Sequence, residues 1–108
     1  ALASSTRYES VKRQLTNAGL IDFFETITTG DMVNHSKPNP EIYQKAIKSL
    51  NLKPEDCIAV EDSPNGIRSA FAANLKVIMI PDKIQPTEDI KQMTEKIYSN
   101  LNYLKEIL

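Results

Sequence analysis

The sequence has few of the residues from which several common kinds of functional site are built. Its 108 residues include one cysteine, one histidine, three glycines and no tryptophan. A single cysteine, Cys57, excludes an internal disulfide, and together with His35 it is too little for a Cys/His zinc site. The three glycines lie too far apart for a P-loop or a dinucleotide-binding fingerprint. A cytoplasmic protein, in which thiols stay reduced, is the simplest expectation.

Neither the charge nor the hydropathy is biased enough to indicate a macromolecular partner. Thirteen basic residues nearly balance fourteen acidic ones, and the formal net charge is −1. A basic surface for nucleic acid, or for an anionic membrane, is therefore not expected. No apolar run approaches the roughly 18 residues needed to cross a bilayer. We expect one small domain over residues 1–108, with neither nucleic acid nor membrane as a partner.

Strand-like and helix-like segments alternate along the chain. Short apolar or β-branched runs predict strands at residues 25–29, 57–60, 77–80 and 96–99, and a further strand that ends at Ser4. Helical spacing predicts helices that end near Gly19 and Asn74, helices that begin at Pro40 and Thr87, and a terminal helix over 101–108. This alternation is typical of an α/β fold with a largely parallel sheet and flanking helices.

The same patterns predict which side chains are buried. The continuous apolar run at 57–60 indicates a strand that is buried on both faces. Ile67, Ala70 and Phe71 are expected to face inward from the helix that follows. Tyr43 lies among apolar neighbours on another helix and is expected to be a core residue.

Three polar clusters lie at strand ends or in loops: Ser4-Ser5-Thr6-Arg7, Ser36-Lys37-Pro38 and Glu61-Asp62-Ser63. In parallel sheets, ligands bind beyond the carboxyl ends of the strands. A hydroxyl, an ammonium group and a pair of carboxylates at one edge of the sheet would suit a phosphate and a divalent cation.

Each cluster also has an ordinary explanation. Glu61 and Asp62 suit a hard cation such as Mg²⁺, but acidic side chains also favour the start of a helix without any metal. Lys37 can hold a phosphoryl oxygen or be a surface lysine. Residues 4–6 suit a helix N-cap as well as an anion contact. His35 is expected to be exposed and to have no catalytic role.

Three segments resemble a known family. The strand ending in Ser4, the stretch SKPNPEIY at 36–43 and the stretch AVEDSPNGI at 59–67 resemble motifs two, three and four of the haloacid dehalogenase (HAD) superfamily. The resemblance covers nearly the whole chain and is closest to the β-phosphoglucomutase-like phosphatase branch. It implies a Rossmann-like core and a Mg²⁺-dependent phosphatase that acts on a small phosphorylated metabolite through an aspartyl-phosphate.

The resemblance also implies a role for each matched residue. Ser4 and Lys37 would be catalytic, because Ser4 would hydrogen-bond the transferring phosphoryl group and Lys37 would neutralise its charge. Asp62 would ligate Mg²⁺, Glu61 would do so directly or through water, and Ser63 would support both. The substrate contacts would be Ser5, Thr6 and Arg7.

One part of the family pattern is missing from the sequence. The first motif, Asp-x-Asp, carries the nucleophile and does not occur in the 108 residues, and the cap domain that precedes Ser4 in this branch is absent too. We therefore expect the C-terminal portion of a HAD core, inactive alone, with a sheet in two pieces. Its open strand edges would pair with a missing N-terminal segment or a swapped chain. The alternatives are a sugar-phosphate mutase, a non-catalytic phosphate- or metal-binding module, and a purely structural fragment.

Overall fold

The computed structural model describes residues 1–80 and 86–98, in which five strands alternate with four α-helices. The strands are β1 (Leu2–Ser4), β2 (Ile27–Thr29), β3 (Ile58–Glu61), β4 (Lys76–Met79) and β5 (Lys96–Ile97). The helices are α1 (Tyr8–Asn17), α2 (Glu41–Ser49), α3 (Pro64–Ala72) and α4 (Glu88–Met93). The predicted α/β alternation is confirmed. Pro81, Ser99 and the predicted helix at 101–108 lie outside the described residues.

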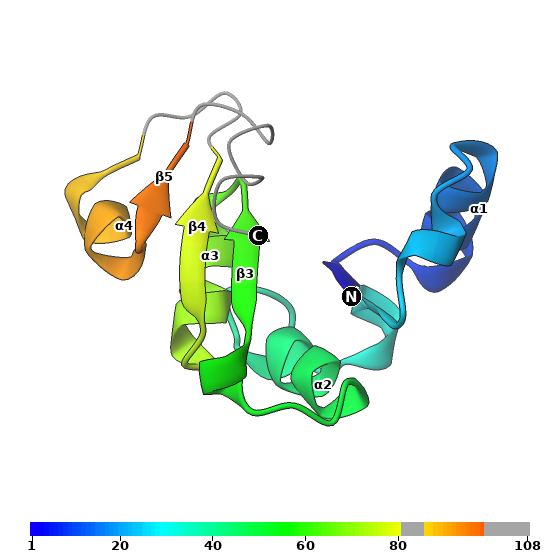
Figure 1. Ribbon diagram of the computed structural model, residues 1–108, viewed down its shortest axis with the longest axis horizontal. Helices are drawn as coiled ribbons and strands as arrows, with labels where there is room; N and C mark the ends of the chain where they lie inside the picture. Colours follow the sequence, from blue (N-terminus) through cyan, green and yellow to red (C-terminus); the bar gives the residue numbers. More distant parts are fainter. Residues whose placement is uncertain (81–85, 99–108) are drawn as a thin grey trace.

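All strand pairs in the described residues are parallel, and they form two sheets. β1 pairs with β2, which places Ser4 opposite Thr29. β4 lies between β3 and β5, and Glu61 at the end of β3 is opposite Met79. Figure 1 shows the three-stranded sheet on one side, α1 on the other and α2 below and between them. The predicted division of the sheet into two pieces is therefore found, with β1 and β3 each paired on one edge only.

The main hydrophobic core lies where α2 and α3 pack near the three-stranded sheet. The apolar face predicted for α2 is buried, and the central strand β4 buries three consecutive residues, each 3% exposed or less. Burial of each large aliphatic side chain contributes about 1.5–3 kcal/mol. The largest fully buried hydrophobic side chains of this core are Ile42, Ile67, Val77, Met79 and Ile90.

The burial prediction for β3 is wrong. Ile58 and Val60 are 49% and 41% exposed, whereas Ala59 and Glu61 between and beyond them are buried. The described residues cover one face of this edge strand and leave the other open, so the alternation of a half-buried strand appears. Cys57 precedes β3 and is partly buried against the core.

Phe71 also differs from the prediction, since its side chain is 49% exposed. The buried stripe of α3 is centred on Gly66, Ala70 and Ala73, which lie one above the other at helical spacing. Phe71 is about 100° around the helix from Ala70 and therefore lies on its flank. Small residues dominate the stripe, so the helix lies close to the neighbouring strands.

Three helices end in the same way. Gly19, Asn51 and Asn74 have φ values of 71°, 56° and 67° and follow α1, α2 and α3. After each, the backbone makes the pair of hydrogen bonds of a Schellman motif, which satisfies the last carbonyls of the helix. The predicted stops at Gly19 and Asn74 are confirmed.

In the described part of the chain, no helix is long and apolar enough to cross a bilayer.

Candidate functional site

Three side chains from different elements meet at the carboxyl end of β3. Lys37 Nζ donates a hydrogen bond to Glu61 Oε1 over 2.7 Å, and the Tyr43 hydroxyl of α2 donates to the same oxygen. Lys37 Nζ also lies 5.3 Å from the centroid of the Tyr43 ring, within the range of cation–π attraction. The side chains of Lys37 and Glu61 are only 14% and 8% exposed. The structure thus brings together two of the residues that the sequence singled out.

This cluster is held by charge as well as by hydrogen bonds. Burial, followed by the charge of the Glu61 carboxylate, raises the pKa of Tyr43, so its hydroxyl stays protonated and donates. Removal of one partner from a buried ion pair leaves an uncompensated charge and costs about 3–5 kcal/mol. The sequence analysis treated Tyr43 only as a core residue, because an apolar helix face does not reveal what the far end of a phenol ring contacts.

Gly66 lies directly against the carboxylate of Glu61. A Cβ atom at this position would overlap the carboxyl group, so only glycine lets Glu61 lie over the first turn of α3. The start of this helix favours a negative charge. Ser63 Oγ accepts the backbone N–H of Gly66 over 3.1 Å and caps the helix, and Pro64 occupies the first helical position. The observed role of Ser63 is therefore a helix cap.

Asp62 directly follows Glu61 in the chain, and its side chain is exposed. Its carboxylate makes no hydrogen bond or ion pair with the other residues described. Mg²⁺ commonly binds one or two carboxylates and completes its octahedron with waters and phosphate oxygens. Asp62 fits such a ligand, and Glu61, whose Oε1 is occupied, fits better through water. Within residues 1–80 and 86–98, no three His, Cys, Asp or Glu side chains gather into a metal site.

The residues after β1 form a turn of their own. Ser4 Oγ accepts the backbone N–H of Thr6 over 3.2 Å, and its own proton remains available for another acceptor. Of the two alternatives for residues 4–6, the helix cap is not found, since the residue before α1 is Arg7. α1 begins later, at Tyr8, and its N–H donates to Asp31 Oδ1 over 3.1 Å. A cap from a residue so distant in sequence leaves no local signal.

The connection after β2 holds this turn in place. Thr29 Oγ1 donates to Asp31 Oδ1 over 2.5 Å, and this hydrogen bond is the main cause of a lowered pKa of Asp31. The backbone N–H of Gly30 donates to the Thr6 carbonyl over 3.2 Å. A Cβ atom on Gly30 would overlap the carbonyl of Ser5. The backbone after β1 and the backbone after β2 therefore approach each other so closely that only glycine fits at position 30.

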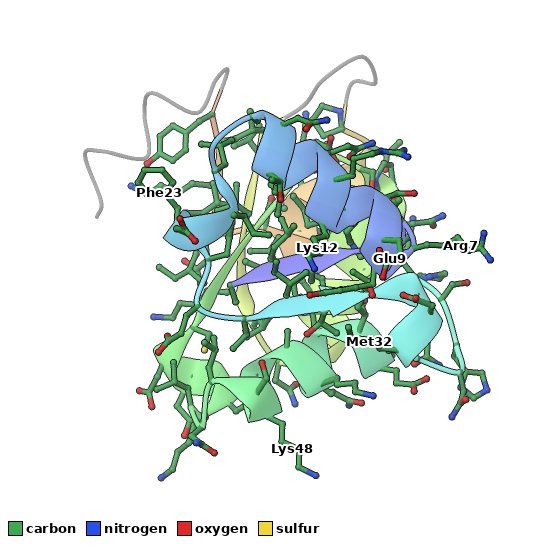
Figure 2. The ribbon with its side chains drawn as sticks, turned by 90° about the vertical axis from the view of Figure 1, so that its right-hand side faces the viewer. Arg7, Glu9, Lys12, Phe23, Met32 and Lys48 are labelled. Carbon is green, nitrogen blue, oxygen red and sulfur yellow. The ribbon has the colours of Figure 1, made fainter. Side chains whose placement is uncertain are left out.

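The predicted substrate contacts lie at the edge of the molecule. Ser5, Thr6 and Arg7 are exposed, and the Arg7 side chain points away from the sheet into solvent (Figure 2). No described hydrogen bond or ion pair joins Ser4 to Lys37, which lies with Glu61 at the end of the other sheet. The candidate site therefore consists of two halves, one at the end of each sheet.

An apolar groove of about 460 Å³ lies between the two sheets. It is bounded by the unpaired edges of β1 and β3 and by one face of α2. Its lining includes Leu2, Ala3, Ala46, Ile58, Val60 and Leu75. The exposed face of β3 is thus one wall of this groove.

Comparison with known proteins identifies the family. Residues 1–80 match the family model of haloacid dehalogenase-like hydrolases. The chain belongs to this family, as its resemblance predicted, and its fold is the Rossmann-like α/β fold of HAD proteins.

Several relatives support this membership. YhcW, a candidate phosphatase of Bacillus subtilis (strain 168), is 45% identical over 86 residues, which are 80% of this chain and 39% of that protein. The phosphorylated carbohydrates phosphatase of Thermotoga maritima is 33% identical over 115 aligned positions, covering 100% of this chain and 52% of that protein. The crystal structure of a candidate β-phosphoglucomutase from Thermotoga maritima superposes with a TM-score of 0.85 at 26% identity, covering 99% of this chain and 52% of that one. The chain therefore spans about half, or less, of the length of these relatives.

Proposed function

We propose that this chain is part of a Mg²⁺-dependent phosphatase that acts on a small phosphorylated metabolite. The observation that carries the proposal is the 2.7 Å contact between Lys37 and Glu61 beside the unpaired carboxylate of Asp62. A fixed cation next to a free acid at a strand end is suited to a phosphate and a metal bound together. The similarity to the candidate phosphatase YhcW of Bacillus subtilis and to the phosphorylated carbohydrates phosphatase of Thermotoga maritima supports this choice.

In this proposal the protein acts by positioning and charge. Lys37, held by Glu61 and Tyr43, neutralises charge on the phosphoryl oxygens as they pass through the transition state. Ser4 donates its free hydroxyl proton to another phosphoryl oxygen, since its Oγ is already fixed by the N–H of Thr6. The exposed Ser5, Thr6 and Arg7 contact the remainder of the substrate.

Asp62 would hold Mg²⁺ directly, Glu61 would hold it through water, and Ser63 supports both by capping α3. The metal, when bound, supplies positive charge to the phosphoryl oxygens. The carboxylate that takes the phosphoryl group and forms the aspartyl-phosphate would come from outside these residues, because no Asp-x-Asp occurs among them.

We also propose that the groove between β1 and β3 receives a further strand, either from a segment that precedes Ala1 in the natural protein or from a swapped chain. Both flanking strands run parallel within their sheets and have one unpaired edge, and the walls between them are apolar. Such edges pair readily with another strand. The chain alone would then lack both the nucleophile and a continuous sheet, and it would be inactive. A cytoplasmic location is a further prediction, which rests on the single cysteine of the chain.

The test uses the full natural protein and a generic aryl phosphate as the substrate. We expect release of phosphate that EDTA abolishes and Mg²⁺ restores. Asp62→Asn should lose most of this Mg²⁺-dependent turnover, whereas Asp89→Asn, a matched change on α4 remote from the site, should keep it. Undiminished turnover of Asp62→Asn would remove Asp62 from the metal site, and a wild-type protein without turnover would refute the proposal.

A sugar-phosphate mutase is the second candidate. It is favoured by the superposition on the candidate β-phosphoglucomutase from Thermotoga maritima, at a TM-score of 0.85. The two activities differ in their products. A phosphatase releases inorganic phosphate in step with the loss of substrate, whereas a mutase converts one sugar monophosphate to another with little release of phosphate.

A further inference from the structure

The first residue of α2, Glu41, makes an unusual set of contacts with the chain before it. Its Oε1 and Oε2 both accept the backbone N–H of Asn34 over 3.0 Å, and Oε1 accepts the N–H of His35 over 2.8 Å. The His35 ring nitrogen Nδ1 lies 3.3 Å from the same oxygen, although this ring is 71% exposed, as expected for His35. The two backbone hydrogen bonds are the main causes of a lowered pKa of Glu41. The Glu41 carboxylate is therefore ionised and hydrogen-bonded to the backbone of residues 34–35.

The segment enclosed by these contacts carries Lys37, and its other end is fixed as well. The backbone N–H of Asn39 donates to the carbonyl of Ser36 over 3.0 Å, and Asn39 Oδ1 accepts the N–H of Glu41 over 2.9 Å. Ser69 of α3, which is fully buried, donates from its Oγ to the carbonyl of Asn39 over 2.7 Å. The loop at 34–41 is thus a ring closed by the side chain of its own last residue and fastened to the core.

The Lys37 side chain reaches from this ring to Glu61 at the end of β3. The 2.7 Å distance between Lys37 Nζ and Glu61 Oε1 depends on where the loop backbone holds the Cα of Lys37. A shift of about 1 Å in a group that acts on reacting atoms can cost a factor of about 100 in rate. Glu41 can therefore fix the position of the Lys37 ammonium group through the loop backbone, without contacting the ammonium group itself.

We propose that Glu41 is a positioning residue for phosphoryl transfer, because its carboxylate fixes the backbone at Asn34 and His35 and thereby sets the place of the Lys37 ammonium. This inference rests on the proposed function of Lys37 as the cation that faces the phosphoryl group. The competing explanation is a structural one, in which an acid at the first position of α2 only stabilises the helix.

The two explanations differ in whether the effect of Glu41 passes through Lys37. The test is a double-mutant cycle in the full natural protein with Glu41→Gln, Lys37→Ala and the double variant. Glu41→Gln keeps the size of the side chain and one acceptor but loses the charge and the second acceptor. The readouts are kcat/KM for an aryl phosphate, the Kd for inorganic phosphate with Mg²⁺ by titration calorimetry, and Tm. Asp89→Asn serves as the matched control, since Asp89 also accepts hydrogen bonds and an ion pair but lies on α4.

We expect Glu41→Gln to lower kcat/KM and to weaken phosphate binding by about 10- to 100-fold, with Asp89→Asn unchanged. In the Lys37→Ala background the same substitution should change the phosphate Kd by less than about twofold, since the group that it positions is gone. Glu41→Asp should recover part of the loss. Equal losses in both backgrounds, or a fall in Tm with unchanged Kd and kcat/KM, would overturn the inference. Wild-type protein that neither turns over an aryl phosphate nor binds phosphate would instead refute the proposed function, and the inference with it.

Discussion

Gly66→Ala tests how firmly the cluster at the end of β3 is held. An added Cβ atom would overlap the carboxylate of Glu61, so the side chain of Glu61 must move. Its Oε1 accepts hydrogen bonds from both Lys37 and Tyr43. The side chain has little room to rotate without breaking both bonds, because it is 8% exposed and enclosed by these partners. The substitution should therefore destabilise the protein, although alanine is the better helix former.

The expected size follows from opposing contributions. Each hydrogen bond to a charged group is worth about 1.5–3 kcal/mol, and disruption of a buried ion pair costs about 3–5 kcal/mol. Alanine in place of glycine inside a helix returns about 1 kcal/mol. We expect a net loss of about 2–4 kcal/mol in the free energy of unfolding.

The assay is urea unfolding of the full natural protein, followed by far-UV circular dichroism. The control is the same substitution in a Glu61→Ala background, where no carboxylate is left to collide with the new methyl group. There Gly66→Ala should stabilise the protein by about 1 kcal/mol. A single Gly66→Ala variant as stable as the wild type would show that Glu61 moves freely, and the argument for a rigid Lys37–Glu61 pair would be refuted.

Three further predictions concern stability and assembly. Tyr43→Phe removes one donor to Glu61 and keeps the ring, so it should lower the free energy of unfolding by about 1.5–3 kcal/mol in the same urea assay; no loss would show that the phenol contributes nothing. Hydrogen bonds from Thr87 and Arg68 lower the pKa of Asp89 to about 2, so its contribution is present above pH ~4 and lost as the pH falls toward 2; Asp89→Asn should be less acid-sensitive than the wild type in acid titrations followed by circular dichroism. The 108-residue chain alone should associate or aggregate in light scattering, because β1 and β3 have open edges; a monodisperse, cooperatively unfolding monomer of 12.1 kDa would contradict this.

Much of the fold could be predicted because its signals are local. The alternation of apolar runs with amphipathic segments predicted the α/β order, and Gly19 and Asn74 marked helix ends through their left-handed conformation. The exposure of Ile58 and Val60 could not be predicted in the same way. A continuous apolar run indicates a strand that can be buried on both faces. It does not show whether the rest of these 108 residues packs against both faces or against only one.

The sequence predicted that Lys37 and Glu61 lie at the same place, but not which other side chains contact them. Their place in polar clusters and the family resemblance singled out Lys37 and Glu61, which do meet, yet neither gave a sign that Tyr43 and Gly66 enclose the same carboxylate. The sequence also gave no sign of side chains that hydrogen-bond to backbone groups far away along the chain. Asp31 stands in for the cap that residues 4–6 were expected to supply, and its partner lies 23 residues away in sequence.

The connection between β2 and α2 governs both halves of the candidate site. At its start, Asp31 holds the N–H of Tyr8 and so fixes the turn that follows Ser4. At its end, Glu41 holds the loop that carries Lys37. Ser4 and Lys37 belong to halves at the ends of different sheets, so their separation depends on this one connection and on whatever occupies the groove between β1 and β3. Both carboxylates accept hydrogen bonds, and these lower the pKa of each. Their hold on the two halves should therefore be complete above pH ~4 and be lost only as the pH falls through these lowered pKa values.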